Sequence, residues 1–493
     1  MHKKMSVRRG AIALAALFLV VGVVDAQDHS VIVRALQHDI SAPLRDVVAR
    51  EDPAALFFVP AALAPAGNIG LNFDGASSSG AYLNADPNGA IGATQYVQWT
   101  NSKYAVYSKA TGATIVPPTS PNLLWTGFGG NCETTNSGNG VVLYDKAAQQ
   151  WIVTHHAGSA PYLQCIAISI TSDASGSYYR YAFPLTTQFP DWPKFGVWPD
   201  AYYITMNILA GSASVGAEVC ALDRTSMLRG APATAQCFTT GSANTDYVLM
   251  PADVDGSTPP PAGSPNYLLS LNTNSLDLFK FHVDWVNPGN STLAGPLNIP
   301  VTPYTNGCNG GYCVPQLGAK QLVDAVGERV MHRFAYRNFG DHESLLATHT
   351  INSSGGTGVA VRWYEIRTPA APVVYQSSVI QPDNKFRSVG SLAMDKLGNL
   401  LIGYSLSSAS MHPAIAFSGR LATDPSGTLQ PETIVLSGTG SQTDKKDFHW
   451  GTHTSMTVDP VDDCTFWYTN EYYKTSGTLW NTRIASFKFP TCQ

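Results

Sequence analysis

Residues 391–404 read SLAMDKLGNLLIGY: an apolar run, a turn containing Asp395, Gly398 and Asn399, and a second apolar run that ends in an aromatic residue. Asp, Gly and Asn favour tight turns, so this stretch predicts a strand, a turn and a second strand. The same unit recurs, once in degenerate form, in residues 96–106, 141–153, 195–204, 252–269, 331–347 and 455–468. Further strand-like runs follow several copies, in residues 165–168, 278–281, 361–364 and 484–487.

Seven units of three or four strands each predict an all-β chain folded as a seven-bladed β-propeller. The spacing between units is irregular, which indicates long inserted loops, notably around residues 208–250 and 286–325. The competing architecture is a pair of β-sandwiches. A sandwich does not require the same unit to recur with its aspartate-bearing turn, so the repeat favours the propeller.

The composition limits the classes of function. The chain has 493 residues, of which only 13% are charged, and its formal net charge is −5. A protein that binds nucleic acid needs a clustered basic face, and this balance offers none. We therefore expect no nucleic-acid partner, and we expect a monomer.

The chain begins like an exported protein. A basic start precedes an apolar run over residues 11–24, and small residues around Ala26 suit a signal peptidase. We predict a signal peptide over residues 1–26 and a secreted or periplasmic protein without a membrane span. Residues 27–70 are predicted to form an extended N-terminal segment, with a cleaved pro-segment as the alternative, and residues 71–493 the propeller.

Eight cysteines follow the predicted signal peptide, and an even number in an exported chain indicates disulfides. Their spacing predicts pairing between sequential neighbours: Cys132 with Cys165, Cys220 with Cys237, Cys308 with Cys313, and Cys464 with Cys492. Zinc binding is the alternative, which the lack of a C-x-x-C pair disfavours.

Polar residues just before the innermost strand of each blade are expected to converge at one mouth of the central channel. Asp191, His449 and His453 are the candidate catalytic residues, because carboxylates and imidazoles serve as general acids and bases. The candidate ligand-binding residues are Lys194, Asp253, Arg329 and Arg387. Each of these residues has a structural alternative, namely capping a turn, packing, or an ion pair between blades.

No metal ligand is assigned, and we expect no cofactor, with calcium as the alternative. His449 and His453 are four residues apart, but they precede a strand and not a helix. Asp253, Asp255 and Gly256 begin like a calcium loop, but Pro259, Pro260 and Pro261 follow and no glutamate stands at the twelfth position.

Three segments resemble the blades of secreted bacterial seven-bladed propellers of the broad sialidase-like group. They are residues 191–200, 336–344 and 455–460, and the resemblance extends over most of residues 70–493. It implies a propeller, and most such proteins lack an assigned activity. The Asp-box motif of sialidases, S-x-D-x-G-x-T-W, is not matched, since residues 172–178 come nearest to it. No sialidase catalytic residue is therefore carried over.

Two functions stay open. The first is a secreted carbohydrate-active enzyme, a glycoside hydrolase or lyase, acting on a polysaccharide or glycoconjugate at the channel mouth. The second is a non-catalytic propeller for glycan or protein binding or for adhesion. A hydrolase requires two acidic groups across one cleft, whereas a binding module would present aromatic platforms without that pair.

Overall fold

The computed structural model describes residues 30–51, 69–78, 80, 84–240, 248–353, 358–367, 371–445 and 448–493. The predicted signal peptide, residues 1–26, lies outside the described residues. Within them, no helix is both long and apolar enough to cross a membrane.

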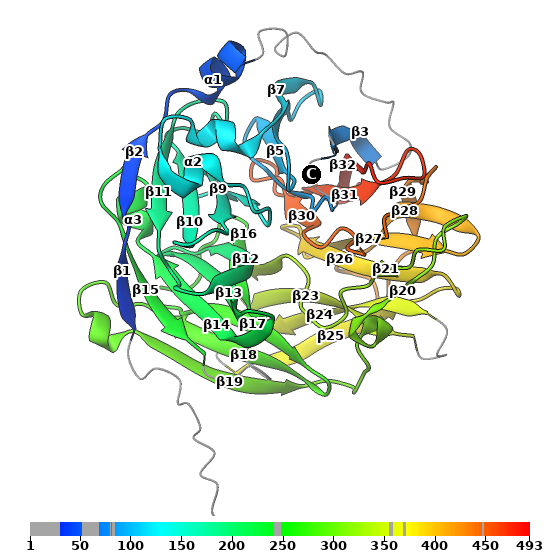
Figure 1. Ribbon diagram of the computed structural model, residues 1–493. Coiled ribbons are helices and arrows are strands. Elements are labelled where there is room, and N and C mark those ends of the chain that lie inside the picture. The colour runs from blue at the N-terminus through cyan, green and yellow to red at the C-terminus, as the bar shows by residue number, and fades with distance from the viewer. Residues whose placement is uncertain are drawn as a thin grey trace, which may run out of the picture.

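The strands form seven blades around a central axis (Figure 1). Blade one contains β4 (Asn88–Ile91), β5 (Gln95–Trp99), β6 (Tyr104–Ser108) and β7 (Thr114–Thr119). Blade two contains β8 (Val141–Asp145), β9 (Gln150–Ala157), β10 (Leu163–Ser169) and β11 (Tyr178–Phe183). Blade three contains β12 (Phe189–Val197), β13 (Tyr202–Ala210), β14 (Ala213–Leu222) and β15 (Thr234–Thr239). Blade four contains β16 (Met250–Asp255), β17 (Asn266–Asn272), β18 (Ser275–His282) and β19 (Thr292–Pro300). Blade five contains β22 (Phe334–Asn338), β23 (Glu343–Asn352), β24 (Val359–Arg367) and β25 (Val373–Ile380). Blade six contains β26 (Phe386–Met394), β27 (Leu400–Ser408), β28 (Met411–Arg420) and β29 (Thr433–Leu436). Blade seven contains β30 (Ser455–Val458), β31 (Thr465–Tyr472), β32 (Asn481–Lys488) and β3 (Ile69–Ser77).

The ring is closed by strands from both ends of the chain. Blade seven takes three strands from the C-terminal region, and β3 pairs antiparallel with β32 to complete it. Blades four and five are further joined, because β16 pairs in parallel with β22. The predicted seven-bladed propeller is confirmed.

The repeat in residues 96–106 is offset from the others. It corresponds to β5 and β6, the second and third strands of blade one, and the innermost strand is β4. β4 is short and reads NGAI, so it lacks the aromatic residues that mark the other units.

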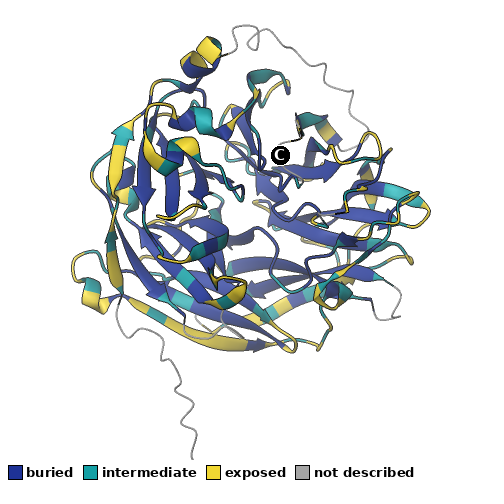
Figure 2. Ribbon diagram, viewed as in Figure 1, coloured by how far each residue is buried: buried dark blue, intermediate teal, exposed yellow. Residues whose placement is uncertain are grey.

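The N-terminal segment extends two blades outward. β1 (Val31–Arg34) pairs with β15, and β2 (Gln37–Ile40) pairs with β11, so each becomes a fifth, outermost strand. Helix α1 (Leu44–Glu51) follows. The outer position of these strands explains their exposure at the rim (Figure 2). β3 begins at Ile69, so the boundary predicted at residue 70 falls inside a strand.

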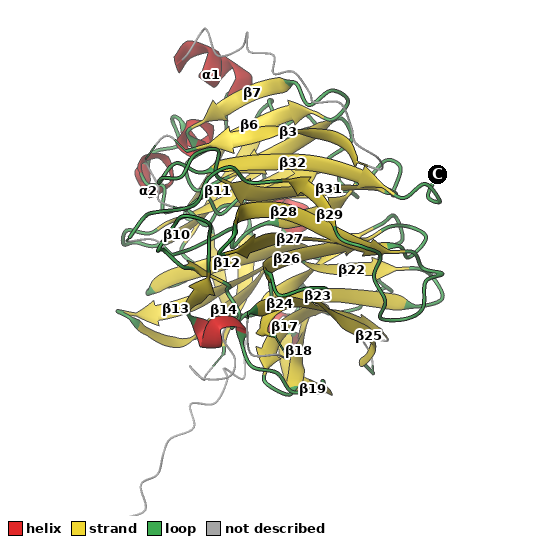
Figure 3. Ribbon diagram, turned by 90° about the vertical axis from the view of Figure 1, so that its right-hand side faces the viewer, coloured by secondary structure: helices red, strands yellow, loops and turns green. Residues whose placement is uncertain are grey.

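Aromatic side chains fill the space within and between the blades. Trp99, Trp125 and Trp198, which could have offered stacking platforms for sugars, are all at most 1% exposed. They are core residues. Strands make up most of the body, and α1 and α2 (Gly130–Thr134) lie together at one side of it (Figure 3).

All four predicted disulfides are confirmed, at sequence separations between 5 and 33 residues. Cys132 ties α2 to β10, and Cys220 and Cys237 face each other across β14 and β15. Cys464 and Cys492 attach the C-terminal residues to blade seven. Pairing is local because each blade brings sequence neighbours side by side.

Candidate functional site

Each innermost strand is reached through a residue with left-handed backbone. This residue lies within the strand or two residues before it in blades one to four and six, four residues before β30 in blade seven and eight residues before β22 in blade five. Its φ is between 43° and 64°: Asp86, Asn139, Trp192, Val248, Val326, Val389 and Gly451. Left-handed backbone is unfavourable for side chains with a Cβ, above all for valine, and costs about 1–3 kcal/mol per residue. Its recurrence in all seven blades indicates that the fold uses it to bend the chain at one mouth of the channel.

A cavity of about 300 Å³ opens at this mouth. We call it the carboxylate cavity, because Asp86, Asp191, Asp324 and Glu328 all line it. The other lining residues are Asn84, Asn101, Ser137, Asn139, Trp192, Val326, Arg329, His449 and Thr452. They come from the lead-in segments of blades one, two, three, five and seven, as the propeller geometry predicted.

The connection between blades four and five supplies three of the charged groups. It forms a small ribbon of β20 (Tyr312–Val314) and β21 (Val323–Asp324). The ribbon is held by other blades, since Ser407 donates to the carbonyl of Pro315 and the amide of Asp324 donates to the carbonyl of Phe448. Asp324, Glu328 and Arg329 are thereby brought to the carboxylate cavity.

A hydrogen-bonded chain runs from the cavity wall into the channel. Asp86 accepts hydrogen bonds from the side-chain amides of Asn84 and Asn101, both at 2.8 Å, and one from the Thr452 hydroxyl. The Thr452 hydroxyl is also hydrogen-bonded to Nδ1 of His453 at 3.0 Å, this Nδ1 lies 3.6 Å from Asp86 Oδ1, and Nε2 of His453 lies 2.5 Å from Lys194 Nζ. Lys194 and His453 are fully buried, so they act behind the cavity wall and not on its surface.

Trp192 separates the two cations of the site. Lys194 Nζ lies 3.9 Å from the centre of its ring, and the guanidinium carbon of Arg329 lies 4.5 Å from it. The negative face of an indole attracts cations. Arg329 also pairs with Glu328, 2.6 Å away, so its charge is neutralised within the protein.

The environments of two carboxylates shift their pKa values in opposite directions. Burial, reinforced by Glu328, raises the pKa of Asp324 despite the hydrogen bond from the amide of Val326. Burial alone would also raise the pKa of Asp86, but His453 and the Thr452 hydroxyl outweigh it and bring the pKa below its usual value. The cavity thus holds one carboxyl that favours its proton and one that stays ionised.

Burial lowers the pKa values of both bases behind the cavity wall. It lowers the pKa of Lys194 well below its usual value, and Arg329 lowers it further, although Asp86 and Asp191 oppose the shift. Burial and Lys194 lower the pKa of His453 to about 4, so this imidazole is neutral near pH 7.

Five of the seven candidate residues lie together. Asp191, Arg329 and His449 line the carboxylate cavity, and Lys194 and His453 lie directly behind it through Asp86 and Trp192. Whether these residues bind or transform a ligand stays a prediction.

Asp253 does not join this cluster, contrary to expectation. Its Oδ2 lies 2.5 Å from Arg333 Nε, and Arg333 also reaches Asp255 Oδ1 at 2.8 Å and the carbonyl of Met456 at 3.1 Å. Arg333 is 2% exposed and connects blades four, five and seven, so it blocks the channel. Asp253 and Asp255, which begin like a calcium loop, are engaged by this arginine.

Arg387 was also expected in the cavity, and this expectation is wrong. Its guanidinium is buried between Glu432, at 2.7 Å, and Asp383, at 2.8 Å. Arg387 lies within β26, where it pairs with Leu406 of β27. Both carboxylates that bind its guanidinium lie outside the residues that line the cavity.

The Arg387→Ala variant is expected to lose stability by about 2–3 kcal/mol, because Glu432 would keep its charge in a mostly buried place without a partner. Ligand binding or turnover per folded molecule should not change. Chemical denaturation combined with an active-site titration measures both quantities. A loss of function in fully folded Arg387→Ala would show that the residue belongs to the site after all.

Sequence reasoning missed Asp86, Asp324 and Thr452. Asp86 and Pro87 directly precede β4, and an aspartate at that place could have indicated Asp86. The repeat predicted for blade one began at β5, however, which is the second strand of the blade. Asp324 was missed because it belongs to an inserted connection without a repeat. Thr452 lies between Gly451 and His453, in a segment for which the prediction named only His449 and His453.

One group of potential metal ligands occurs among the described residues. It consists of Glu218, Cys220 and Cys237. The two thiols are joined in a disulfide and cannot bind a metal as thiolates.

No protein-family model matches the chain, and no curated protein matches it. Three solved structures with a similar fold are an ulvan lyase of a new polysaccharide lyase family, the endosialidase of phage phi92 and an α-L-arabinofuranosidase from Lactobacillus brevis. The ulvan lyase has 9% identity, and the match covers 82% of this chain and 97% of that one, with a TM-score of 0.36. The endosialidase has 11% identity, and the match covers 70% of this chain and 66% of that one, with a TM-score of 0.36. The arabinofuranosidase has 11% identity, and the match covers 72% of this chain and 91% of that one, with a TM-score of 0.31. At these scores the likenesses assign neither an activity nor a substrate to this chain.

Proposed function

We propose that the chain is a glycoside hydrolase that cleaves an uncharged polysaccharide in the carboxylate cavity. The observation that carries this proposal is the convergence of four carboxylates around one cavity, with opposite pKa shifts at Asp324 and Asp86. Glycoside hydrolysis requires one carboxyl that donates a proton and one that is ionised. Environments that separate two pKa values define such a pair.

Asp324 is the proposed general acid, because it retains its proton to a higher pH than an ordinary aspartate. It would protonate the oxygen of the leaving sugar as the glycosidic bond breaks. Asp86 is the proposed ionised partner, which would activate a water molecule or stabilise the positive charge that develops on the sugar ring. His453 and Thr452 position Asp86 and do not contact the sugar themselves.

The lining of the cavity favours an uncharged sugar. Its amide and hydroxyl groups, from Asn84, Asn101, Asn139 and Ser137, suit the hydroxyls of a sugar ring. Its arginine is already paired with Glu328, and four carboxylates would repel a uronate. The four disulfides support the further proposal that the protein works outside the reducing cytoplasm.

The test measures new reducing ends after incubation with polysaccharides of different charge. Two of the similar structures suggest suitable members of the panel, namely arabinan as an uncharged polymer and ulvan as a uronate-containing one. Ultraviolet absorbance of the products reports an unsaturated uronate, which a lyase forms and a hydrolase does not. We expect reducing ends from an uncharged polymer, without unsaturation.

Asp324→Asn and Asp86→Asn should each lower the rate by about 10²–10⁴-fold, the usual contribution of general acid–base catalysis. In the unsubstituted protein the rate should fall as the pH rises through the raised pKa of Asp324, because the acid then loses its proton. Asp341→Asn is the matched control, since the Asp341 side chain is 82% exposed and far from the cavity lining.

Three results would contradict the proposal: full activity in folded Asp324→Asn, unsaturated products, or polysaccharide binding without any cleavage. The second would indicate a lyase and the third a non-catalytic binding propeller.

A further inference from the structure

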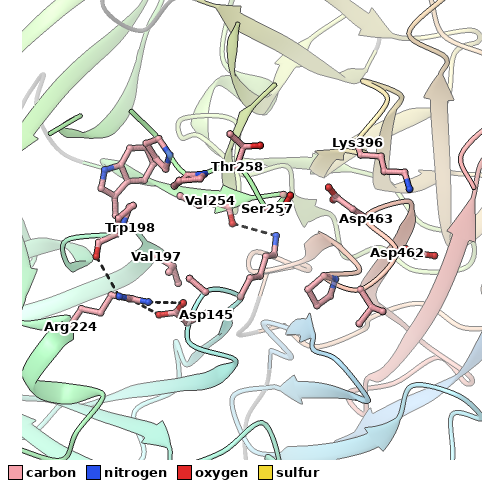
Figure 4. A pocket seen from close by; sticks show the side chains of 18 residues that line it. Asp145, Val197, Trp198, Arg224, Val254, Ser257, Thr258, Lys396, Asp462 and Asp463 are labelled. Atoms are coloured by element: carbon pink, nitrogen blue, oxygen red, sulfur yellow. Dashed lines mark hydrogen bonds and ion pairs between the residues drawn. The ribbon is translucent and has the colours of Figure 1, made fainter. Parts of the chain in front are cut away.

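A second cavity, of about 570 Å³, opens at the opposite mouth of the channel (Figure 4). We call it the distal cavity. Its lining comes from the far ends of the innermost strands, since Asp145 ends β8, Val197 ends β12 and Val254 lies near the end of β16. The carboxylate cavity is lined by the lead-in segments instead, so the two cavities lie at opposite ends of the channel.

The two cavities are separate sites. Arg333 crosses the channel between them and is bound to Asp253, Asp255 and the carbonyl of Met456. A fully hydrogen-bonded, buried guanidinium leaves no passage for a sugar. The distal cavity is therefore not the exit of the carboxylate cavity, and its ligand must be explained by its own lining.

Five of the six charged side chains that line the distal cavity have a charged partner in the protein, and the sixth, Lys396, donates to the carbonyl of Gln493 at 2.7 Å. Arg224 binds Asp145 through two nitrogen atoms, at 2.6 and 3.0 Å, and Lys146 pairs with Asp255. Asp463 is held by Arg337 at 2.6 Å. A charged ligand would lose its hydration here without gaining a free partner, so the cavity favours an uncharged molecule.

The remaining surface combines an apolar wall with free hydroxyl groups. Val254, Pro199, Pro259 and Val461 supply the apolar surface, and Val461 is 66% exposed. Ser257 and Thr258 are exposed, and in the described part of the chain neither hydroxyl has a hydrogen-bond partner. Prolines 199, 259, 260 and 460 make the wall rigid before a ligand arrives.

From this lining we propose that the distal cavity binds an uncharged molecule that joins an aromatic ring to a polyhydroxy group, the chemistry of a phenolic glycoside. The ring lies against Val254 and the exposed prolines 199 and 259, and the hydroxyls bind Ser257 and Thr258. The volume is within the range of small-molecule sites and almost twice that of the carboxylate cavity. This inference does not depend on the proposed hydrolase activity.

Calorimetry or ligand-observed NMR with phenyl thioglucoside tests the inference, because the sulfur resists hydrolysis. Methyl thioglucoside lacks the ring, and benzoate has the ring but carries a charge. We expect phenyl thioglucoside to bind about ten- to a hundredfold more tightly than methyl thioglucoside, the effect of burying one ring. Benzoate should bind more weakly than phenyl thioglucoside.

Variants locate the binding. Ser257→Trp should fill the cavity, and Val461→Asp should add an unpaired charge at its rim, so each should weaken binding at least about tenfold. Thr258→Val removes only a hydroxyl and should also weaken binding. It tests the same cavity if Ser257→Trp fails to fold. Val286→Asp is the matched control, because Val286 is 86% exposed and outside the cavity. Its binding should be unchanged.

The inference is overturned if phenyl thioglucoside does not bind, or if binding survives in both folded Val461→Asp and folded Thr258→Val. Binding that is lost in Asp324→Asn but not in these variants would place the ligand in the carboxylate cavity and would equally overturn it. Hydrolysis of a polysaccharide should be unaffected by Thr258→Val, so the outcome for each cavity is read separately.

Discussion

Acidification from about pH 6.5 to about pH 4 should destabilise this protein by several kcal/mol. The cause is a set of five buried histidines: His155, His156, His332, His349 and His453. Burial is the largest influence on each of them. It lowers the pKa of His155 and His349 to about 3 and that of His156 and His453 to about 4, and it lowers the pKa of His332 well below its ordinary value.

The sign follows from proton binding. In the unfolded chain a histidine takes up its proton near pH 6.5, whereas these five stay neutral in the folded protein until the pH is much lower. Between these values the unfolded state binds more protons, so stability is complete above pH 6.5 and is lost as the pH falls. A shift from 6.5 to about 4 corresponds to about 3 kcal/mol for one histidine.

Four carboxyl groups act in the opposite direction. Burial raises the pKa of Asp200 to about 6 and that of Glu218 to about 7, so the folded state binds these protons first and gains stability on acidification. Burial also raises the pKa values of Asp324 and Asp395, but by less. Two large shifts and two smaller ones do not offset the large shifts of five histidines, so the net effect of acid is destabilising.

Urea denaturation at about pH 7 and about pH 5 measures this effect directly. The His155 ring stacks on Trp99, with ring centres 5.9 Å apart, and meets Trp125 edge to face at 5.4 Å, so phenylalanine suits the site. His155→Phe should reduce the loss of stability at the lower pH. His342→Gln, at a partly exposed position, should leave it unchanged. Equal stability at both pH values in the unsubstituted protein would refute the explanation.

Removing the arginine that blocks the channel should have the other large effect. Arg333→Met is expected to lower the free energy of unfolding by about 3–5 kcal/mol, because it leaves buried carboxylates without their partner. Asp253 is 5% exposed and Asp255 is 1% exposed, so water cannot replace the guanidinium. Burial alone would raise the pKa of Asp255, and it is Arg333 and Lys146 that bring the pKa below its usual value.

A second substitution identifies the cause. Adding Asp253→Asn to Arg333→Met should restore part of the stability, since it removes one unpaired charge and keeps the oxygen that accepts from the Val197 amide at 3.0 Å. Arg45→Met is the control. Its pair with Asp173 has side chains 51% and 40% exposed, and exposed pairs contribute about 0–1 kcal/mol. Equal losses in Arg333→Met and Arg45→Met would show that burial of the pair is unimportant.

The carboxylate cavity was predictable only in part. We expected the residues just before each innermost strand to meet at one mouth of the channel, because all innermost strands run in the same direction. This rule placed Asp191, Arg329 and His449 correctly in the carboxylate cavity. It failed for Arg387, because the guanidinium of this residue is bound by Asp383 and Glu432, and the second of these carboxylates lies 45 residues further along the chain. Asp324 could not be found, because its position depends on how an inserted connection packs against blades five to seven.

The sequence by itself determined the all-β class, the seven blades and the four disulfides. Each of these follows from residues close together in the chain: strand–turn–strand units such as residues 391–404, and cysteines that blades bring side by side. Only the tertiary structure decided which charged groups face the channel mouth and which pair with one another. Arg333 and Asp253 lie 80 residues apart, and Asp86 and Thr452 lie 366 residues apart. Such contacts form when the ring closes, because closure brings β3 and β4 from near the start of the chain beside β30 to β32 from its end.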